Sequence, residues 1–352
     1  MSAPEPMPTP LNGYVGFDTL LKQIQNKLLH RGFQFNVMVV GQTGLGKSTL
    51  VNTLFASKLL DTKGRMEPSD EIPQTTTITA DSHLVVENGV KLRLNLVDTP
   101  GYGDLINNEH CWEPIVKYIK DQYSVYLRKE LTAVRERHIA DTRVHAVLFF
   151  INPSGHSLRP IDIQVLKKLG DIANVIPVIA KADTLTIEER NIFKKRIRAA
   201  LQANSIRTYP FDHDDYEDEE RDINSNVQAL LPFAVVGSDR MYEVDGRLVR
   251  GRRSHAGIVV VDDENHCEFT PLRNFLLRSH LHDLIDTTSH TYYESFRSKQ
   301  LLALKESSAK QHQQQHQQQP LPQVPQQYGT SSATTPAPGV AASGPVAGAQ
   351  YA

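Results

Sequence analysis

The sequence predicts an α/β protein in which helices flank a mostly parallel sheet, followed by a small β meander and a disordered C-terminal tail. Three observations carry this expectation. Strand-like and helix-like segments alternate to about residue 236, as in parallel sheets with crossover helices. A glycine-rich turn at 41–48 separates an apolar strand from a helix. From about residue 307 the chain is rich in Gln, His, Pro, Ala and Gly, a composition that cannot bury a core.

The first elements follow a short arm. Residues 1–13 are proline-rich and predict a flexible N-terminal arm, which leaves 14–306 as the folded domain. Apolar residues at helical spacing predict a helix over 17–29. The apolar run Val37–Val40 predicts a buried strand, and the stretch Thr49–Phe55 predicts a helix after the turn. The polar segment 61–79, which contains two prolines, predicts a mobile loop.

The later elements are two further strands, a meander and a helix. Leu92–Val97 alternates like a strand, and Val175–Ile179 is an apolar run. Residues 241–267 predict a small β meander within an added element at about 237–302. Helical periodicity returns over 272–284. The tail, 307–352, contains no heptad pattern, so we expect no coiled-coil partner through it.

The segment 41–48 is a complete P-loop, Gly41-Gln42-Thr43-Gly44-Leu45-Gly46-Lys47-Ser48, and Thr49 begins the helix behind it. Its glycines allow backbone N–H groups to surround phosphate oxygens, and the helix N-terminus adds a positive dipole end. Lys47 supplies a charge for the β- and γ-phosphates, and the Ser48 hydroxyl is a Mg²⁺ ligand. The segment therefore predicts a nucleotide-binding site.

Two further motifs favour a guanine nucleotide. Asp98-Thr99-Pro100-Gly101 follows the strand at 92–97, where a carboxylate can hold Mg²⁺ through water and the Gly101 N–H can sense a γ-phosphate. Ala180-Lys181-Ala182-Asp183 follows the strand at 175–179. An aspartate here accepts both guanine N1–H and N2–H₂, while the Lys181 stem covers the base. Each tetrapeptide alone is weak, but the order of the three motifs predicts a GTP/GDP site with Mg²⁺.

The chain resembles the septin family, most of all the short fungal septins that lack a C-terminal coiled coil. The generic part of the resemblance is the P-loop, Val-Asp-Thr-Pro-Gly-Tyr-Gly-Asp at 97–104 and Pro-Val-Ile-Ala-Lys-Ala-Asp at 177–183. The family-specific part is Pro-Phe-Ala-Val-Val-Gly-Ser at 232–238, Val-Arg-Gly-Arg at 249–252 and Tyr-Glu-Ser-Phe-Arg at 293–297. The match extends over about residues 14–302 and implies a P-loop GTPase domain with an added septin-specific element.

The resemblance also implies further site residues. In septins that hydrolyse GTP a switch I threonine contacts Mg²⁺, and gap-free counting places it at Thr75; a slip to Thr76 or Thr77 stays open. The residues that we expect to act in hydrolysis are Thr75, Lys47, Ser48 and Gly101, and the expected Mg²⁺ ligands are Ser48, Thr75 and Asp98. The residues expected near the base or near a partner's nucleotide are His156, Glu189, Val236, Gly237 and Arg252. Tyr102 stands where Ras-like enzymes have a water-orienting glutamine, so we expect slow turnover.

Composition excludes several classes. A formal net charge of −2 argues against a dedicated nucleic-acid binder. The sequence has no 18-residue apolar run and no N-terminal signal pattern, and its two cysteines predict no disulfide framework, as expected for a cytoplasmic protein. Lys22, Lys27, His30 and Arg31 form a thin basic cluster, which predicts weak binding to anionic lipids.

The function that the resemblance implies is a slowly hydrolysing septin subunit that joins other septins in filaments or rings at the cell cortex. Such polymers act as scaffolds and diffusion barriers in cytokinesis and septum formation, at a division site or bud neck. Assembly would use a nucleotide-facing surface and an opposite surface built from the N- and C-terminal helices. Two alternatives stay open: a monomeric switch GTPase acting through effectors, and a structural protein whose bound GDP never turns over.

Overall fold

A computed structural model describes residue 16 and residues 19–60, 77–103, 108–132, 139–211, 218–254 and 257–317, with no side-chain description for 218 and 308–317. Four expectations lie wholly or largely outside these residues: the N-terminal arm at 1–13, the mobile loop at 61–79, Thr75 as the switch I residue, and the tail beyond 317. The chain divides into a compact unit, Met1–Leu301, and a second unit, Leu302–Ala352.

The first unit is built on a six-stranded sheet with the strand order β2-β3-β1-β4-β5-β6. All neighbouring strands pair in parallel except β2 and β3, which form an antiparallel hairpin at one edge. The strands are β1 (Phe33–Gly41), β2 (Thr79–Glu87), β3 (Val90–Asp98), β4 (Ala146–Ile151), β5 (Val175–Ile179) and β6 (Phe233–Ala234). The prediction of a mostly parallel sheet is confirmed.

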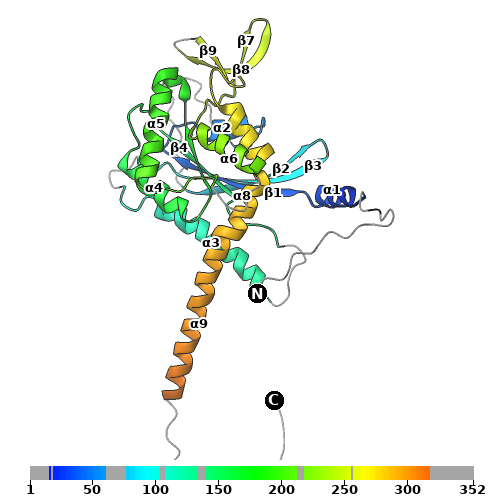
Figure 1. Cartoon of the computed structure of the whole chain (residues 1–352), viewed down its shortest axis with the longest axis vertical. Helices are drawn as coiled ribbons and strands as arrows, with labels where there is room; N and C mark the ends of the chain where they lie inside the picture. Colours follow the sequence, from blue (N-terminus) through cyan, green and yellow to red (C-terminus); the bar gives the residue numbers. More distant parts are fainter. Residues whose placement is uncertain are drawn as a thin grey trace, which may run out of the picture. The chain divides into compact units, whose positions relative to one another are not determined.

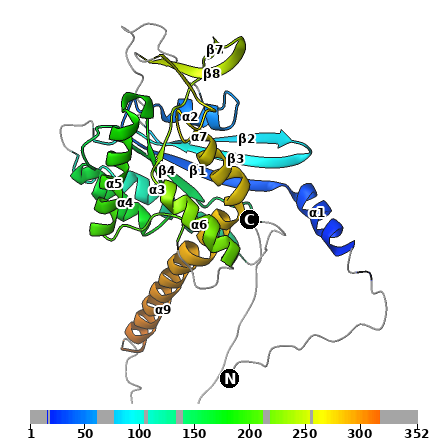
Figure 2. The ribbon, with the colours of Figure 1, turned by 45° about the horizontal axis from the view of Figure 1, so that its top comes forward.

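Helices lie on both faces of this sheet (Figure 1). They include α2 (Lys47–Leu54), α3 (Glu113–Leu131), α4 (Pro160–Gly170), α5 (Ile187–Ala203) and α6 (Asp218–Leu230), whereas α1 (Leu20–Arg31) projects beyond the amino end of β1 (Figures 1 and 2). The local sequence explains where two of these helices begin. Pro160 occupies the first turn of α4, where its missing N–H costs nothing, and Thr186 with Glu189 forms a capping box at α5. In contrast to the others, α1 buries none of its residues.

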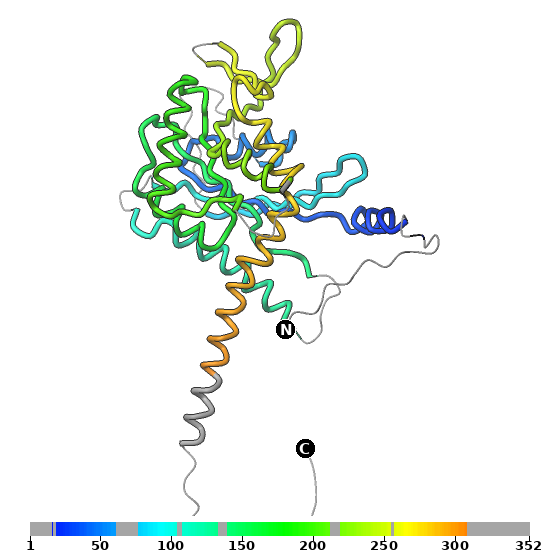
Figure 3. Tube along the Cα trace, viewed as in Figure 1, coloured from blue at the N-terminus to red at the C-terminus, as the bar shows by residue number. Residues whose placement is uncertain are grey.

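The added element begins with a separate three-stranded antiparallel sheet. Its strands are β7 (Met241–Val244), β8 (Arg247–Ser254) and β9 (Gly257–Val260). Asp245 and Gly246 both have positive φ, 52° and 73°, as a tight hairpin turn requires. The predicted meander is therefore confirmed, and it stands beyond the end of α2, clear of the main sheet (Figures 2 and 3).

The C-terminal helical region differs from the single helix predicted over 272–284. It consists of α7 (Phe269–Asn274), the π-helical segment η3 (Phe275–Ser279), α8 (Leu281–Thr287), the π-helical segment η4 (Thr288–Tyr293) and α9 (Glu294–Gln317). The structure also differs from the prediction that the tail is disordered from residue 307, because α9 continues to Gln317. Lys and Gln are good helix formers, which favours continuation of the helix through this polar stretch.

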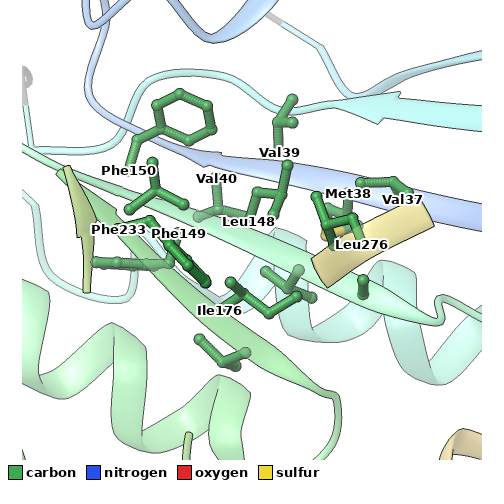
Figure 4. Close-up of a cluster of buried hydrophobic side chains, with 14 of the residues drawn as sticks. Val37, Met38, Val39, Val40, Leu148, Phe149, Phe150, Ile176, Phe233 and Leu276 are labelled. Carbon is green, nitrogen blue, oxygen red and sulfur yellow. The ribbon is translucent and has the colours of Figure 1, made fainter. Parts of the chain in front are cut away.

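The core lies along β1, β4 and β5, whose central residues are buried on both faces. Met38, Phe149 and Ile176 are fully buried among the side chains drawn in Figure 4. Leu276, from η3 of the added element, belongs to the same cluster and is also fully buried. The added element is thus part of the domain core. Within the described residues no helix has the length and apolar character needed to cross a membrane.

Candidate nucleotide-binding site

The P-loop joins the end of β1 to the start of α2. Gly44 and Gly46 have φ of 77° and 84°, a left-handed conformation that side chains disfavour. A Cβ on Gly41 would lie 2.7 Å from the Cβ of Phe150 in β4, so the loop also needs glycine for close packing. Lys47 is buried, and its Nζ donates to the carbonyls of Gly41, at 3.1 Å, and Gln42, at 3.0 Å. The lysine charge is therefore held inside the loop that would surround phosphates. The remaining predicted residues lie along the same turn: Thr43, Leu45, Ser48 and Thr49.

Asp98 ends β3 beside the first turn of α2. Burial raises the pKa of this carboxyl, and the nearby Lys47 charge and a Ser48 hydrogen bond oppose the shift. Among the described residues, its Oδ1 is a buried oxygen without a hydrogen-bond partner. The strand end is fixed by Thr99, whose hydroxyl donates to the Val39 carbonyl at 2.8 Å. A buried carboxylate oxygen without a donor, next to a serine hydroxyl, fits a hydrated Mg²⁺.

No cluster of three or more His, Cys, Asp or Glu side chains suited to a metal occurs in the part of the chain that the structure describes. Mg²⁺ does not require one, because it usually keeps several waters and binds one or two carboxylates together with substrate phosphates. The donor set at Ser48 and Asp98 is of that kind.

Gly101 is packed directly against the P-loop. A Cβ on this residue would overlap both the side chain and the backbone of Thr43. Glycine is therefore required here by the approach of the loop after β3 to the phosphate-binding loop, which places the Gly101 backbone next to the turn around Thr43. Tyr102, the next residue, is turned into the core and is 4% exposed, so it does not occupy the position of a water-orienting side chain.

The base-side residues come from two strand ends and the meander. Lys181 adopts a left-handed backbone, with φ of 47°, directly after β5. The Asp183 side chain is 5% exposed and pairs with Arg252 of β8, Nη1 to Oδ1, at 3.1 Å. Val236 is fully buried, and a Cβ on Gly237 would lie 2.9 Å from Cα of Leu50 in α2.

Backbone contacts connect these base-side loops. The Ala182 N–H donates to the Val235 carbonyl at 3.1 Å. The Ser238 N–H donates to the Thr53 hydroxyl of α2, also at 3.1 Å. The segment at 235–238 is thus fixed to both the P-loop helix and the Lys181–Asp183 turn, at the carboxyl end of the parallel strands.

His156 and Glu189 lie outside this group. His156 is exposed in the loop between β4 and α4, and its carbonyl accepts from Arg196 Nη1 at 3.3 Å. The Glu189 carboxylate accepts from the N–H and hydroxyl of Thr186 in the capping box, at 2.9 and 3.0 Å. The structure gives Glu189 a local role in starting α5, and contacts of either residue with a partner's nucleotide remain a prediction.

Three supporting residues escaped the sequence analysis. Asn52 holds the segment before residue 61 by accepting from the N–H groups of Leu59 and Leu60, both at 2.9 Å. Arg250 Nη1 donates to the Thr53 carbonyl at 2.8 Å, which joins β8 to α2. Asn152 donates to Gln42 Oε1 at 3.0 Å. No local sequence pattern marks such contacts, because their partners are set by the fold.

The septin family model matches residues 31–310, a range that includes the P-loop, the base-side loops and the whole meander. The chain belongs to the septin family. Its relatives include septin homolog spn2 of Schizosaccharomyces pombe, 59% identical over 86% of this chain and 92% of that protein. Cell division control protein 10 of Candida albicans is 55% identical over 86% of this chain and 84% of that protein.

A solved septin structure agrees with the fold. The septin GTPase domain of Chlamydomonas reinhardtii superposes with a TM-score of 0.55 and 27% identity, covering 75% of this chain and 98% of that chain. The expected fold class and family are both confirmed. This septin carries the three motifs of a GTPase at the carboxyl ends of β1, β3 and β5; β1 and β3 are neighbours, and β4 lies between β1 and β5.

Proposed function

We propose that this septin binds GTP and GDP with Mg²⁺ and hydrolyses GTP slowly. The observation that supports the proposal most is that three loops lie at the carboxyl end of the parallel strands: the P-loop, the loop at Asp98–Gly101 packed against it, and the turn at Lys181–Asp183. In this assignment Lys47 balances phosphate charge, Ser48 and Asp98 hold Mg²⁺, and the Gly101 N–H binds the γ-phosphate. When bound, Mg²⁺ would neutralise charge on the phosphate oxygens.

Slow turnover follows from what surrounds Gly101. The buried Tyr102 replaces a water-orienting glutamine. Arg159, whose guanidinium lies near Gly103, is engaged by Asp162 through two hydrogen bonds at 3.0 and 2.8 Å. An arginine finger contributes about 10³–10⁵ in rate to related enzymes, and an arginine held by a carboxylate in this way would not make that contribution. Thr75 is the proposed switch I residue.

We further propose that the protein assembles with other septins into filaments or rings at the cell cortex. A role in cell division is suggested by the name of two fungal relatives, cell division control protein 10. The nucleotide-facing surface would include His156, Glu189 and Arg252. The opposite surface would include α1, whose apolar residues are exposed. The basic residues of α1 would add weak binding to anionic lipids, and nucleic acid is not proposed as a partner.

Asp183 provides the sharpest test of guanine recognition. Asp183→Asn should weaken GDP binding by about 1–3 kcal/mol per unpaired donor, and it should favour xanthosine diphosphate, whose O2 accepts from the new amide. Competition binding on the full-length chain measures both effects. Asp262→Asn, a change at a half-exposed carboxylate, is the matched control. An unchanged preference for guanine in Asp183→Asn would contradict the assignment.

Hydrolysis itself is tested at Thr75. Thr75→Ala should slow single-turnover GTP hydrolysis much more than it weakens GDP binding, because the hydroxyl acts only when the γ-phosphate and Mg²⁺ order switch I. Thr76→Ala and Thr77→Ala are the controls for register. Sedimentation of the wild-type chain with GDP and with partner septins separates a filament subunit from a monomeric switch, which would sediment as a monomer in every mixture.

A further inference from the structure

Tyr102 makes contacts that the proposed function does not use. It follows Gly101 directly, its ring packs against Phe149 of β4 with centroids 5.9 Å apart, and its hydroxyl donates to Asp162 Oδ1 at 2.9 Å. Asp162 lies in the first turn of α4 and is 2% exposed. Burial, together with the adjacent Asp162 charge, raises the pKa of Tyr102 well above its ordinary value, so the phenol stays protonated and donates.

Asp162 is held in turn by Arg159. The guanidinium of Arg159 forks across both carboxylate oxygens, Nε to Oδ2 at 3.0 Å and Nη2 to Oδ1 at 2.8 Å. Such a two-point contact fixes orientation as well as position. Arg159 is the last residue of the loop between β4 and α4, and a Cβ on Gly103 would lie 3.6 Å from its Nη1. The residues after Gly101 and the end of this loop are therefore joined through one buried carboxylate.

The beginning of the same loop is also attached to the phosphate side. Asn152, the first residue after β4, donates to Gln42 Oε1 of the P-loop at 3.0 Å. The exposed His156 lies between these two attachments, and Arg196 of α5 supports the middle of the loop at the Gly155 and His156 carbonyls. A displacement of Gly101 or of Gln42 thus acts on the loop that presents His156.

We propose that Tyr102 is a positioning residue that couples the Gly101 backbone to the His156 loop through Asp162 and Arg159. The inference rests on the proposed guanine nucleotide site, and it assigns that site a specific route to the nucleotide-facing surface. When a γ-phosphate binds the Gly101 N–H, the adjacent Tyr102 shifts. Its hydroxyl moves Asp162 and, through it, Arg159. The backbone of the His156 loop then becomes more or less ordered. GTP and GDP then present different surfaces to a partner subunit.

The chain offers a matched pair of substitutions. Tyr102→Phe deletes the hydroxyl and keeps the ring. Tyr123→Phe deletes another buried tyrosine hydroxyl, which donates to the Ile172 carbonyl at 2.7 Å, on α3 and apart from the loops of the site. If Tyr102→Phe fails to fold, Arg159→Lys serves as the second variant, because it keeps the charge and loses the fork.

The experiment uses the full-length chain with GDP or a slowly hydrolysed GTP analogue. The first readout is the ratio of the two affinities, and the second is the difference in hydrogen–deuterium exchange of residues 152–159 between the two nucleotides. Tyr102→Phe should change the affinity ratio by ~10-fold, the value of one hydrogen bond to a charged acceptor. It should also abolish the exchange difference, whereas Tyr123→Phe should alter neither readout even if it lowers the Tm equally.

The outcomes separate the two claims. If the wild-type chain binds neither nucleotide, the proposed function fails. If it binds both, but Tyr102→Phe keeps the wild-type affinity ratio and exchange difference, the positioning role is overturned and the nucleotide site stands. A wild-type loop whose exchange is the same with both nucleotides also overturns the positioning role.

Discussion

Buried charged groups at the two ends of the main sheet differ in whether another side chain pairs with them. At the carboxyl end, Asp98 keeps one buried oxygen unpaired among the described residues, and Lys47 donates to carbonyls of its own loop. At the amino end, Arg143 forks onto Asp141 at 2.9 and 2.7 Å, and its guanidinium lies 4.1 Å from the ring centroid of Tyr126. The Asp141–Arg143 pair at the amino end thus stabilises the fold, whereas Asp98 and Lys47 at the carboxyl end remain suited to a ligand.

The amino-end cluster joins segments that are far apart in the sequence. Asn36 of β1 donates to the carbonyls of Asp141, at 3.0 Å, and Arg143, at 2.6 Å. His145 Nδ1 accepts from the Asn36 N–H, so the ring proton is on Nε2, which lies 3.2 Å from Asp141 Oδ2. Asn174 donates to His145 and Leu284, although its Oδ1 has no partner in the described part of the chain. Buried polar groups are thus used mainly for packing at this end.

The largest effect is expected from breaking the amino-end cluster. Arg143→Met should lower the free energy of unfolding by about 3–5 kcal/mol, because it leaves Asp141 buried without its guanidinium partner. Arg273→Met, which removes an exposed ion pair with Asp262, should cost no more than about 1 kcal/mol. Denaturant unfolding of both variants checks the difference. Equal losses would mean that the amino-end cluster adds nothing beyond a surface pair.

Substitutions at the carboxyl end of the sheet should change nucleotide affinity and leave the free energy of unfolding nearly unchanged. Lys47→Ala should weaken guanine nucleotide binding by about 2–5 kcal/mol, the usual effect of removing one member of a buried charge contact. The free energy of unfolding without nucleotide should change little. Nucleotide content after purification and titration with GDP measure the binding, and Lys168→Ala, at an exposed lysine of α4, is the control. Normal nucleotide content in Lys47→Ala would refute the site assignment.

A pH series tests the charge at the amino end. Burial alone would raise the pKa of Asp141, but hydrogen bonds from Arg143 and His145 outweigh it and hold this pKa well below the ordinary value. The ionised form therefore stabilises the fold above the unfolded pKa near 3.9, and the gain is lost as pH falls through the lower folded value. Asp141→Asn should cost on the order of 2 kcal/mol at pH 7.

The difference between wild type and Asp141→Asn should shrink below about pH 4, because the Asp141 carboxyl of the unfolded chain takes up a proton there while the folded one keeps its charge to lower pH. Urea unfolding between pH 3 and pH 7 follows both proteins, with Asp262→Asn as a variant that should show no such trend. A constant difference across this range would show that the charge of Asp141 is not what stabilises the cluster.

The smallest effect should have the opposite sign. Asp98→Asn, measured without nucleotide and in the presence of a chelator, should raise the free energy of unfolding by about 1 kcal/mol, because it removes a buried charge that lacks a partner on one oxygen. The same change should weaken Mg²⁺-dependent nucleotide binding. If Asp98→Asn instead destabilises the chain under these conditions, Asp98 belongs with the structural charges of the amino end.

Short-range patterns predicted much of the molecule. The P-loop, the strand ends at Asp98 and Asp183 and the meander turn at Asp245-Gly246 all depend on residues close together in the chain, and their backbone geometry follows from glycine and strand periodicity. The C-terminal region was predicted less well. The sequence did not reveal the π-helical segment η3 that interrupts 272–284, or η4 beyond it, because such interruptions depend on tertiary packing.

The sequence by itself determined the fold class, the family and the phosphate-binding loop, because each depends on the spacing of residues that are close together in the chain. Only the tertiary structure decided which long-range partners those residues have. Arg252 meets Asp183, Tyr102 meets Asp162, and the Asn36 amide meets the carbonyls of Asp141 and Arg143, in each case across different elements. A side-chain hydrogen bond depends on distance and angle in space, and sequence spacing leaves both undetermined once the partners lie on different elements.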